Sequence, residues 1–135
     1  MNETKKEWST SDSEDFYRNL LKRAINSIPE NGAVMVLGPM FILRPPEENF
    51  ALFTKVQEYL KSKGLEVFDQ LAFVDYILKD APFNYEMKFE IFYKELIKSG
   101  KIKACYLLSE WEKSEGTKKE IGYCKEAGIP VYEIN

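Results

Sequence analysis

The chain has 135 residues, of which 44% are hydrophobic and 30% are charged, and its formal net charge is −3. This length and composition are typical of one globular domain with its own hydrophobic core. The negative charge argues against nonspecific nucleic-acid binding, and no hydrophobic run approaches the ~20 residues that a membrane span requires. The first eight residues lack the hydrophobic stretch of a secretory signal, so we expect a cytoplasmic protein.

The sequence contains no histidine and two cysteines, Cys105 and Cys124. Without histidine, serine–histidine triads, cysteine–histidine pairs and the usual zinc sites are excluded. Both cysteines lie in hydrophobic segments, and we interpret them as buried free thiols in a reducing compartment. Any chemistry must therefore use carboxylates, hydroxyls and backbone amides, and we predict no metal site.

The first predicted helix follows a polar segment. We interpret residues 1–12 as a flexible tail and residues 13–135 as a single domain. Hydrophobic side chains recur at helical spacing over residues 13–28, and Pro29 ends this helix. The helix precedes the core of the domain, residues 33–134, so we expect it to pack on one face of the sheet or on a partner.

The rest of the chain alternates between short hydrophobic runs, typical of buried strands, and segments of helical periodicity. We predict strands at 33–37, 65–68, 102–108 and 130–134, and helices at 47–63, within 69–84, at 85–99 and from 116 to 128. Strands that alternate with helices indicate a parallel sheet with right-handed crossovers. The predicted fold is α/β, a three-layer sandwich with a flavodoxin- or Rossmann-like parallel sheet of four to five strands and an extra N-terminal helix.

Two loops form the candidate site. If the predicted strands have the order 2-1-3-4, ligands should bind where the order reverses, beside the loops 38–40 and 109–116. The second loop carries Ser114 and Gly116 and leads into a helix whose first turns contain Glu120. Free backbone N–H groups and the positive end of the helix dipole suit an anion there. A carboxylate in such a helix lies close to whatever the loop binds.

Two sets of residues form a recognisable pattern. The first set comprises Val36-Leu-Gly-Pro-Met40, Glu48-Asn49-Phe50, Phe53, Leu60, Gly64 and Val67. The second comprises Leu107-Leu108, Trp111-Glu112, Ser114, Gly116, Glu120 and Gly128-Ile-Pro-Val131. Together, over residues 33–134, they resemble small nucleoside 2-deoxyribosyltransferase-like proteins. The resemblance implies a small-molecule nucleoside or nucleotide as substrate, no cofactor, and a homodimer or larger homo-oligomer.

The resemblance also implies a mechanism. In that family a glutamate at the position of Glu120 attacks the anomeric carbon of a nucleoside or nucleotide and releases the base. A second base (transfer) or water (hydrolysis) then resolves the glycosyl-enzyme. A serine at the position of Ser114 goes with members that accept nucleoside monophosphates. Two positions depart from the family pattern: Met35 replaces a tyrosine, and Glu95 is the nearest equivalent of an aspartate that positions sugar or base.

We therefore predict Glu120 and Glu95 as catalytic residues. The predicted substrate-binding residues are Gly38, Pro39, Met40, Asn49, Trp111, Ser114 and Gly116. A second hypothesis is a catalytically silent nucleotide-binding or sensor protein on the same fold, which the departures at Met35 and Glu95 would favour. The two hypotheses differ in geometry, because an enzyme requires Glu120 to face an open pocket beside Gly38.

Each predicted site residue also has a purely structural interpretation. Glu120 and Glu95 are surface charges in that case, and Ser114 is a helix N-cap. The Gly38-Pro39 turn ends a strand, Trp111 covers the hydrophobic core, and Asn49 braces its loop. A further aromatic set is typical of core or subunit interface; it comprises Phe83, Tyr85, Phe89, Phe92 and Tyr93.

Overall fold

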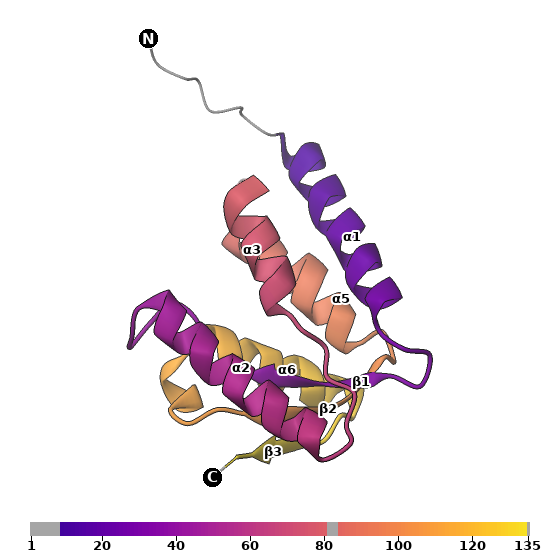
Figure 1. The fold of residues 1–135 in the computed structure, drawn as a ribbon. Helices are drawn as coiled ribbons and strands as arrows, with labels where there is room; N and C mark the ends of the chain where they lie inside the picture. The colour runs from indigo at the N-terminus through magenta and orange to yellow at the C-terminus, as the bar shows by residue number, and fades with distance from the viewer. Residues whose placement is uncertain (1–8, 81–83, 135) are drawn as a thin grey trace.

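The computed structural model describes residues 9–80 and 84–134, and these form a mixed α/β protein (Figure 1). Strands β1 (Ala33–Leu37), β2 (Ile102–Leu107) and β3 (Val131–Glu133) form one parallel sheet in the order β1-β2-β3. The predicted α/β class and parallel sheet are thereby confirmed. None of the helices in the described residues is both long and hydrophobic enough to cross a membrane.

The sheet of the described residues has three strands, so the prediction of four to five was wrong. The predicted strand 65–68 makes a single bridge, between Val67 and Val34, beside β1. Its backbone bonds are Val34 N–H to Glu66 O and Phe68 N–H to Val34 O, both 2.9 Å. Directly after this segment, the Asp69 carboxylate accepts a hydrogen bond from the Leu71 N–H at 3.1 Å, which forms a turn that leads into the next helix.

The α-helices of the described residues lie close to the predicted segments. They are α1 (Thr10–Ser27), α2 (Pro46–Ser62), α3 (Leu71–Asp80), α4 (Tyr85–Met87), α5 (Lys94–Ile97) and α6 (Glu115–Ala127), with a short 3₁₀ helix, η2 (Trp111–Lys113). Helix α1 begins three residues before its predicted start. The reason is a capping box, in which Asp12 N–H donates to Ser9 Oγ at 3.0 Å and Ser9 N–H donates to Asp12 at 3.2 Å. The predicted tail lies outside the described residues up to residue 8, and Phe83 also lies outside them.

The side chains of β1 alternate between two hydrophobic clusters. Met35 and Leu37 belong to a large cluster that includes residues of α1, α5 and α6, whereas Val34 and Val36 belong to a small cluster with α2. This alternation follows from the two-residue period of a strand. The large cluster also contains Cys105 and Cys124, which are buried free thiols as predicted.

The helix predicted at 85–99 contains a π-helical segment, η1 (Lys88–Tyr93), between α4 and α5. Residues five apart point about 140° away from each other in a regular α-helix. The wider turn of a π-helix, with its i→i+5 hydrogen bonds, instead brings them to the same side of the helix. Lys88 and Tyr93 therefore lie on one side of the helix, and both are buried.

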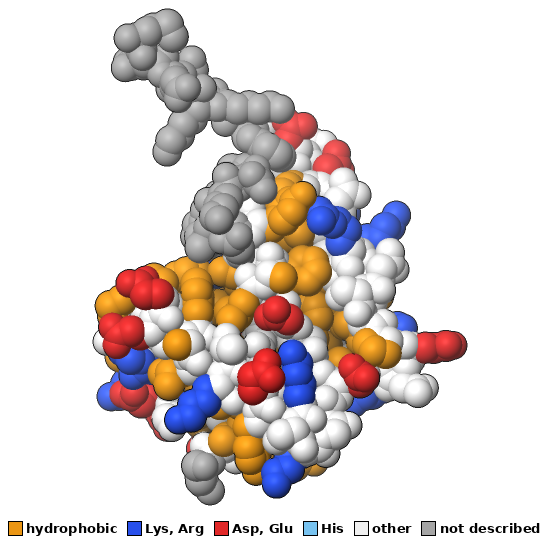
Figure 2. Space-filling model, viewed as in Figure 1, with side chains coloured by type: hydrophobic (Ala, Val, Ile, Leu, Met, Phe, Trp, Pro, Cys, Tyr) orange, Lys and Arg blue, Asp and Glu red, His pale blue; other side chains and the backbone are white. Residues whose placement is uncertain are grey.

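Acidic and basic side chains alternate over the face seen in Figure 2, with hydrophobic side chains exposed between them. That face carries no continuous basic surface of the kind that binds nucleic acid. Large exposed hydrophobic residues include Leu52 and Tyr59 on α2, and Phe41 in the loop after β1.

Candidate functional site

A cavity of about 300 Å³ lies between the end of β1, helix η1 and the first turns of α6, and we call it the β1–α6 cavity. This volume is at the lower end of the range for pockets that hold small organic ligands. The loop after β1 and the residue that precedes α3 complete its wall. The polar side chains in its lining are Gln70, Tyr85, Lys88, Tyr93, Lys113, Ser114, Glu115, Thr117 and Glu120.

Glu120 is the most perturbed acid of the cavity. It lies in the second turn of α6, and 7% of it is exposed. Among residues 9–80 and 84–134, its carboxyl group has no hydrogen-bond or ion-pair partner. Burial raises its pKa to about 8, although the charge of Lys88 acts in the opposite direction. A buried, perturbed carboxyl group that faces a cavity is a candidate functional group.

Lys88 lies on the same cavity wall and is 8% exposed. Its Nζ lies 4.9 Å from the ring centroid of Phe89, 5.4 Å from that of Phe41 and 5.6 Å from that of Tyr85. Burial lowers the pKa of Lys88, and the charge of Glu120 opposes that effect. The two groups therefore favour each other's charged forms across a poorly solvated space.

Tyr93 is a phenol in the same lining and is 2% exposed. Burial, together with the neighbouring charge of Glu120, raises the pKa of Tyr93 well above its ordinary value. The hydroxyl therefore keeps its proton at every physiological pH and remains a hydrogen-bond donor.

Ser114 and Gly116 line the cavity and also have structural roles. The Ser114 hydroxyl caps α6, because it accepts from Thr117 N–H at 3.2 Å and from the Thr117 hydroxyl at 2.9 Å. A Cβ at Gly116 would lie 2.7 Å from Cζ of Phe89, so only glycine lets α6 approach η1 this closely. The first-turn N–H groups of α6, which have no partner within the helix, lie beside the cavity at Glu115 and Gly116.

The turn after β1 contributes Gly38 and Met40 to the cavity lining. A Cβ at Gly38 would lie 2.8 Å from the side chain of Leu108, so close packing against the end of β2 requires this glycine. Pro39 is buried but is not one of the lining residues. The turn therefore serves both the packing of the sheet and the shape of the cavity.

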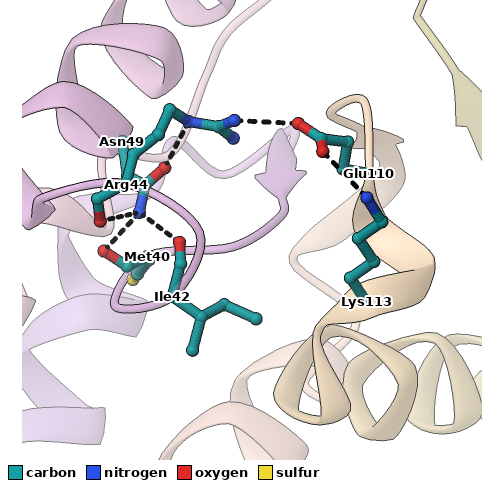
Figure 3. Close-up of polar contacts among 6 residues, drawn as sticks. All are labelled: Met40, Ile42, Arg44, Asn49, Glu110 and Lys113. Atoms are coloured by element: carbon teal, nitrogen blue, oxygen red, sulfur yellow. Dashed lines mark hydrogen bonds and ion pairs between the residues drawn. The ribbon is translucent and has the colours of Figure 1, made fainter.

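Asn49 holds the loop after β1 in place through the hydrogen bonds drawn in Figure 3. It is not among the residues that line the cavity. It is 0% exposed, and its amide donates to the carbonyl oxygens of Met40 and Ile42, both at 3.0 Å, and of Arg44 at 3.3 Å. Its own oxygen accepts from Arg44 Nε at 3.0 Å. These contacts agree with the structural interpretation of Asn49, in which it braces its loop.

An ion-pair bridge joins this loop to the loop after β2 (Figure 3). Arg44 Nη1 lies 2.8 Å from Glu110 Oε1, and Lys113 Nζ lies 3.3 Å from Glu110 Oε2. The hydrogen bond from Arg44, followed by that from Lys113, lowers the pKa of Glu110. Glu110 has a positive φ of 65°. The bridge connects the two predicted site loops.

Two other predicted residues lie elsewhere. Trp111 is half-buried against the large cluster, and its Nε1 donates to Glu133 at 3.1 Å. Glu95 is exposed on α5. Neither is among the residues that line the cavity. The second charged group that faces Glu120 is instead Lys88.

Sequence reasoning missed Lys88 and Gln70. Lys88 immediately precedes Phe89 and lies four residues before Phe92, so a cation on the hydrophobic face of a predicted helix was the available signal. Gln70 is 1% exposed, donates to the Val36 carbonyl and accepts from Gln57 at 3.3 Å. Nothing in the pattern around Gln70 distinguishes it from a surface glutamine.

A comparison with protein-family models matches residues 32–133 to the family described as Domain of unknown function (DUF4406). The matched range contains the three strands and every residue of the β1–α6 cavity, and it excludes α1. Comparisons with curated proteins and with solved structures found no match.

Proposed function

The chain belongs to the DUF4406 family, and we propose that it cleaves or exchanges the N-glycosidic bond of a nucleoside or nucleoside 5′-monophosphate through a covalent intermediate on Glu120. The observation that carries the proposal is the carboxyl group of Glu120, which lies on the wall of the β1–α6 cavity in a side chain that is 7% exposed and has no hydrogen-bond or ion-pair partner among the described residues. The proposal includes a flavodoxin-like three-layer arrangement, a cytoplasmic location and a homo-oligomeric assembly.

The proposed reaction has two displacements at the anomeric carbon. In the first, an ionised Glu120 oxygen bonds to C1′ while the C1′–N bond breaks, and the base nitrogen keeps the electron pair and takes up a proton. In the second, the oxygen of water or the nitrogen of a second base bonds to C1′. The ester bond then breaks, its electron pair returns to Glu120, and the proton of the incoming group passes to solvent. Water gives hydrolysis, and a base gives transfer.

The aromatic side chains of the cavity suit a nucleobase. Phe41, Tyr85 and Phe89 line it, and their side chains give it the hydrophobic wall that a planar base requires. Its volume of about 300 Å³ matches a ligand of nucleoside size. A phosphate would be attracted by Lys88 and by the N–H groups at the start of α6.

Tyr93 supplies the phenol that the first strand lacks. The resembling family carries a tyrosine where this chain has Met35, which is 0% exposed within the large cluster. Tyr93 reaches the β1–α6 cavity from η1 instead and keeps its hydroxyl proton. In the proposed reaction this hydroxyl donates a hydrogen bond to a sugar oxygen or to the Glu120 carboxylate and so orients the nucleophile.

The test is release of free base from a panel of ribo- and deoxyribonucleosides and their 5′-monophosphates, with and without an acceptor base. The protein is compared with Glu120→Gln, which preserves shape, and with Glu112→Gln, a control at an exposed position. We expect release by the wild type and the control, none by Glu120→Gln, and a glycosylated peptide containing Glu120 in quenched samples.

Two outcomes would overturn the proposal. Release that persists in Glu120→Gln would exclude this residue as the nucleophile. The absence of release from every substrate, together with a rise in melting temperature caused by one nucleotide, would instead support the silent nucleotide-binding protein.

A further inference from the structure

The side chain of Lys88 has an unusual position for a lysine. Lysine is among the residues least often buried, yet Lys88 is 8% exposed and its Nζ lies within 5.6 Å of three aromatic ring centroids. The rings belong to Phe41 in the loop after β1, to Tyr85 in α4 and to Phe89 in η1. Ring faces attract a cation and replace part of its lost hydration. The surroundings therefore favour an ammonium group at this point.

The π-helical turn brings this ammonium to the cavity wall. Lys88 and Tyr93 are five residues apart, and both line the cavity that Glu120 faces. In a regular α-helix the same two positions would diverge by about 140°. π-helical turns cost backbone hydrogen-bond geometry and are frequent at functional sites.

We propose that Lys88 is a positioning residue for the Glu120 reaction: its ammonium group, held near three aromatic rings on the wall of the β1–α6 cavity, favours the ionised, nucleophilic form of the Glu120 carboxyl group on the same cavity. Burial without a partner strongly disfavours a carboxylate, and a cation in the same poorly solvated space reverses part of that effect. This role extends the proposed function, which needs an ionised nucleophile.

Other titratable groups near Glu120 do not supply the same charge. Tyr93 on η1, Cys105 on β2, and Tyr123 and Cys124 on α6 interact with it electrostatically and carry no positive charge. Lysines of neighbouring elements are paired with other acids: Lys98, which follows α5, lies 2.5 Å from Glu126, and Lys113 of η2 lies 3.3 Å from Glu110. Lys94 of α5 lies 4.0 Å from Glu90.

The experiment compares Lys88→Met with Lys88→Arg, which keeps the charge, and with Lys119→Met, which removes an exposed cation next to Glu120 in the sequence. The first readout is the ionisation of Glu120 itself, followed by NMR in protein with ¹³C-labelled glutamate and assigned with Glu120→Gln. We expect the midpoint to rise by at least about one pH unit in Lys88→Met, to return toward the wild type in Lys88→Arg, and to stay unchanged in Lys119→Met.

The second readout is base release against pH. In Lys88→Met, kcat/KM at pH 7 should fall at least about tenfold, while the plateau at high pH is largely kept, because one pH unit corresponds to a factor of ten in the ionised fraction. An equal loss at every pH would show a different role for Lys88. If no base is released by the wild type, the proposed function fails, but the NMR midpoint still tests the inference.

A measurement on the wild type covers the case in which Lys88→Met does not fold. The ¹⁵Nζ signal of Lys88 should show an inflection at the pH where Glu120 titrates, because interacting groups sense each other's ionisation. An unchanged Glu120 midpoint in folded Lys88→Met, or a Lys88 signal without that inflection, would overturn the inference.

Discussion

The substitution Glu120→Gln should change the pH dependence of stability. The ordinary pKa of a glutamate is 4.5, and burial raises that of Glu120 to about 8 in the folded protein. Between pH 4.5 and about pH 8, the folded chain keeps the proton of the Glu120 carboxyl group and the unfolded chain releases it. Each pH unit in that window is worth about 1.4 kcal/mol, so ionisation of Glu120 weakens the fold by up to about 5 kcal/mol.

The sign follows from the raised pKa in the folded state. The stabilisation by the neutral acid is fully present below pH 4.5 and is lost as the pH rises to about 8. Glutamine has nearly the same shape and does not titrate, so its variant lacks this loss. The free energy of unfolding of Glu120→Gln relative to the wild type should therefore increase steadily from pH 5 to pH 8.

Urea unfolding followed by circular dichroism at several pH values measures this difference. Any cost of burying the glutamine amide is the same at each pH, so it shifts the plot of unfolding free energy against pH without changing its slope. Glu112→Gln, at an exposed position, is the matched control and should run parallel to the wild type. Parallel curves for Glu120→Gln and the wild type would refute the argument, because Glu120 would then titrate as an ordinary surface acid.

Three further predictions concern the same cavity and its support. In the wild type, kcat/KM for base release should rise about tenfold per pH unit and level off near pH 8, where Glu120 becomes ionised. A kcat/KM that falls over this range would instead indicate that Glu120 acts as a general acid. Gly116→Ala would place a Cβ 2.7 Å from Phe89 and should lower the free energy of unfolding by about 1–3 kcal/mol. Gly122→Ala, whose Cβ would have nothing within 4 Å, should raise the free energy of unfolding by about 0.5–1 kcal/mol. Equal changes in melting temperature for the two variants would contradict the packing argument. Asn49→Ala removes a fully buried side chain that donates to three carbonyl oxygens. We therefore expect the free energy of unfolding, measured by chemical denaturation, to fall by about 1–3 kcal/mol. A decrease below about 0.5 kcal/mol would show that water replaces the amide.

Hydrophobic runs and helix-end signals in the sequence predicted most of the fold. The bounds of β1 were predicted without error because Ala33–Leu37 is buried on both faces and is followed directly by Gly38. The N-terminus of α6 was also predictable, since Ser114 has the residue type and the place of an N-cap. The strand at 65–68 was overestimated, because its composition fits a strand while the turn at Asp69 leaves room for a single bridge.

The candidate site was predictable in part. Glu120 could be selected because its helix starts beside a loop at the sheet edge, a relation fixed by topology. For Lys88 the sequence offered a single signal, a cation on the hydrophobic face of its helix. Its position beside Tyr93 depends on the π-helical turn of η1, which the residues of Lys88–Tyr93 do not predict.

The stability of the fold does not explain Glu120. Its carboxyl group makes no hydrogen bond with the described residues, and its ionisation weakens the fold as the pH rises toward 8. A glutamine or a hydrophobic residue at this position would remove that loss. Ser114 and Asn49 differ in this respect, because their contacts within the protein account fully for their burial. A group that costs stability, faces a cavity and shares that cavity with a buried cation is a candidate for a functional role, which is why our proposal is built on Glu120.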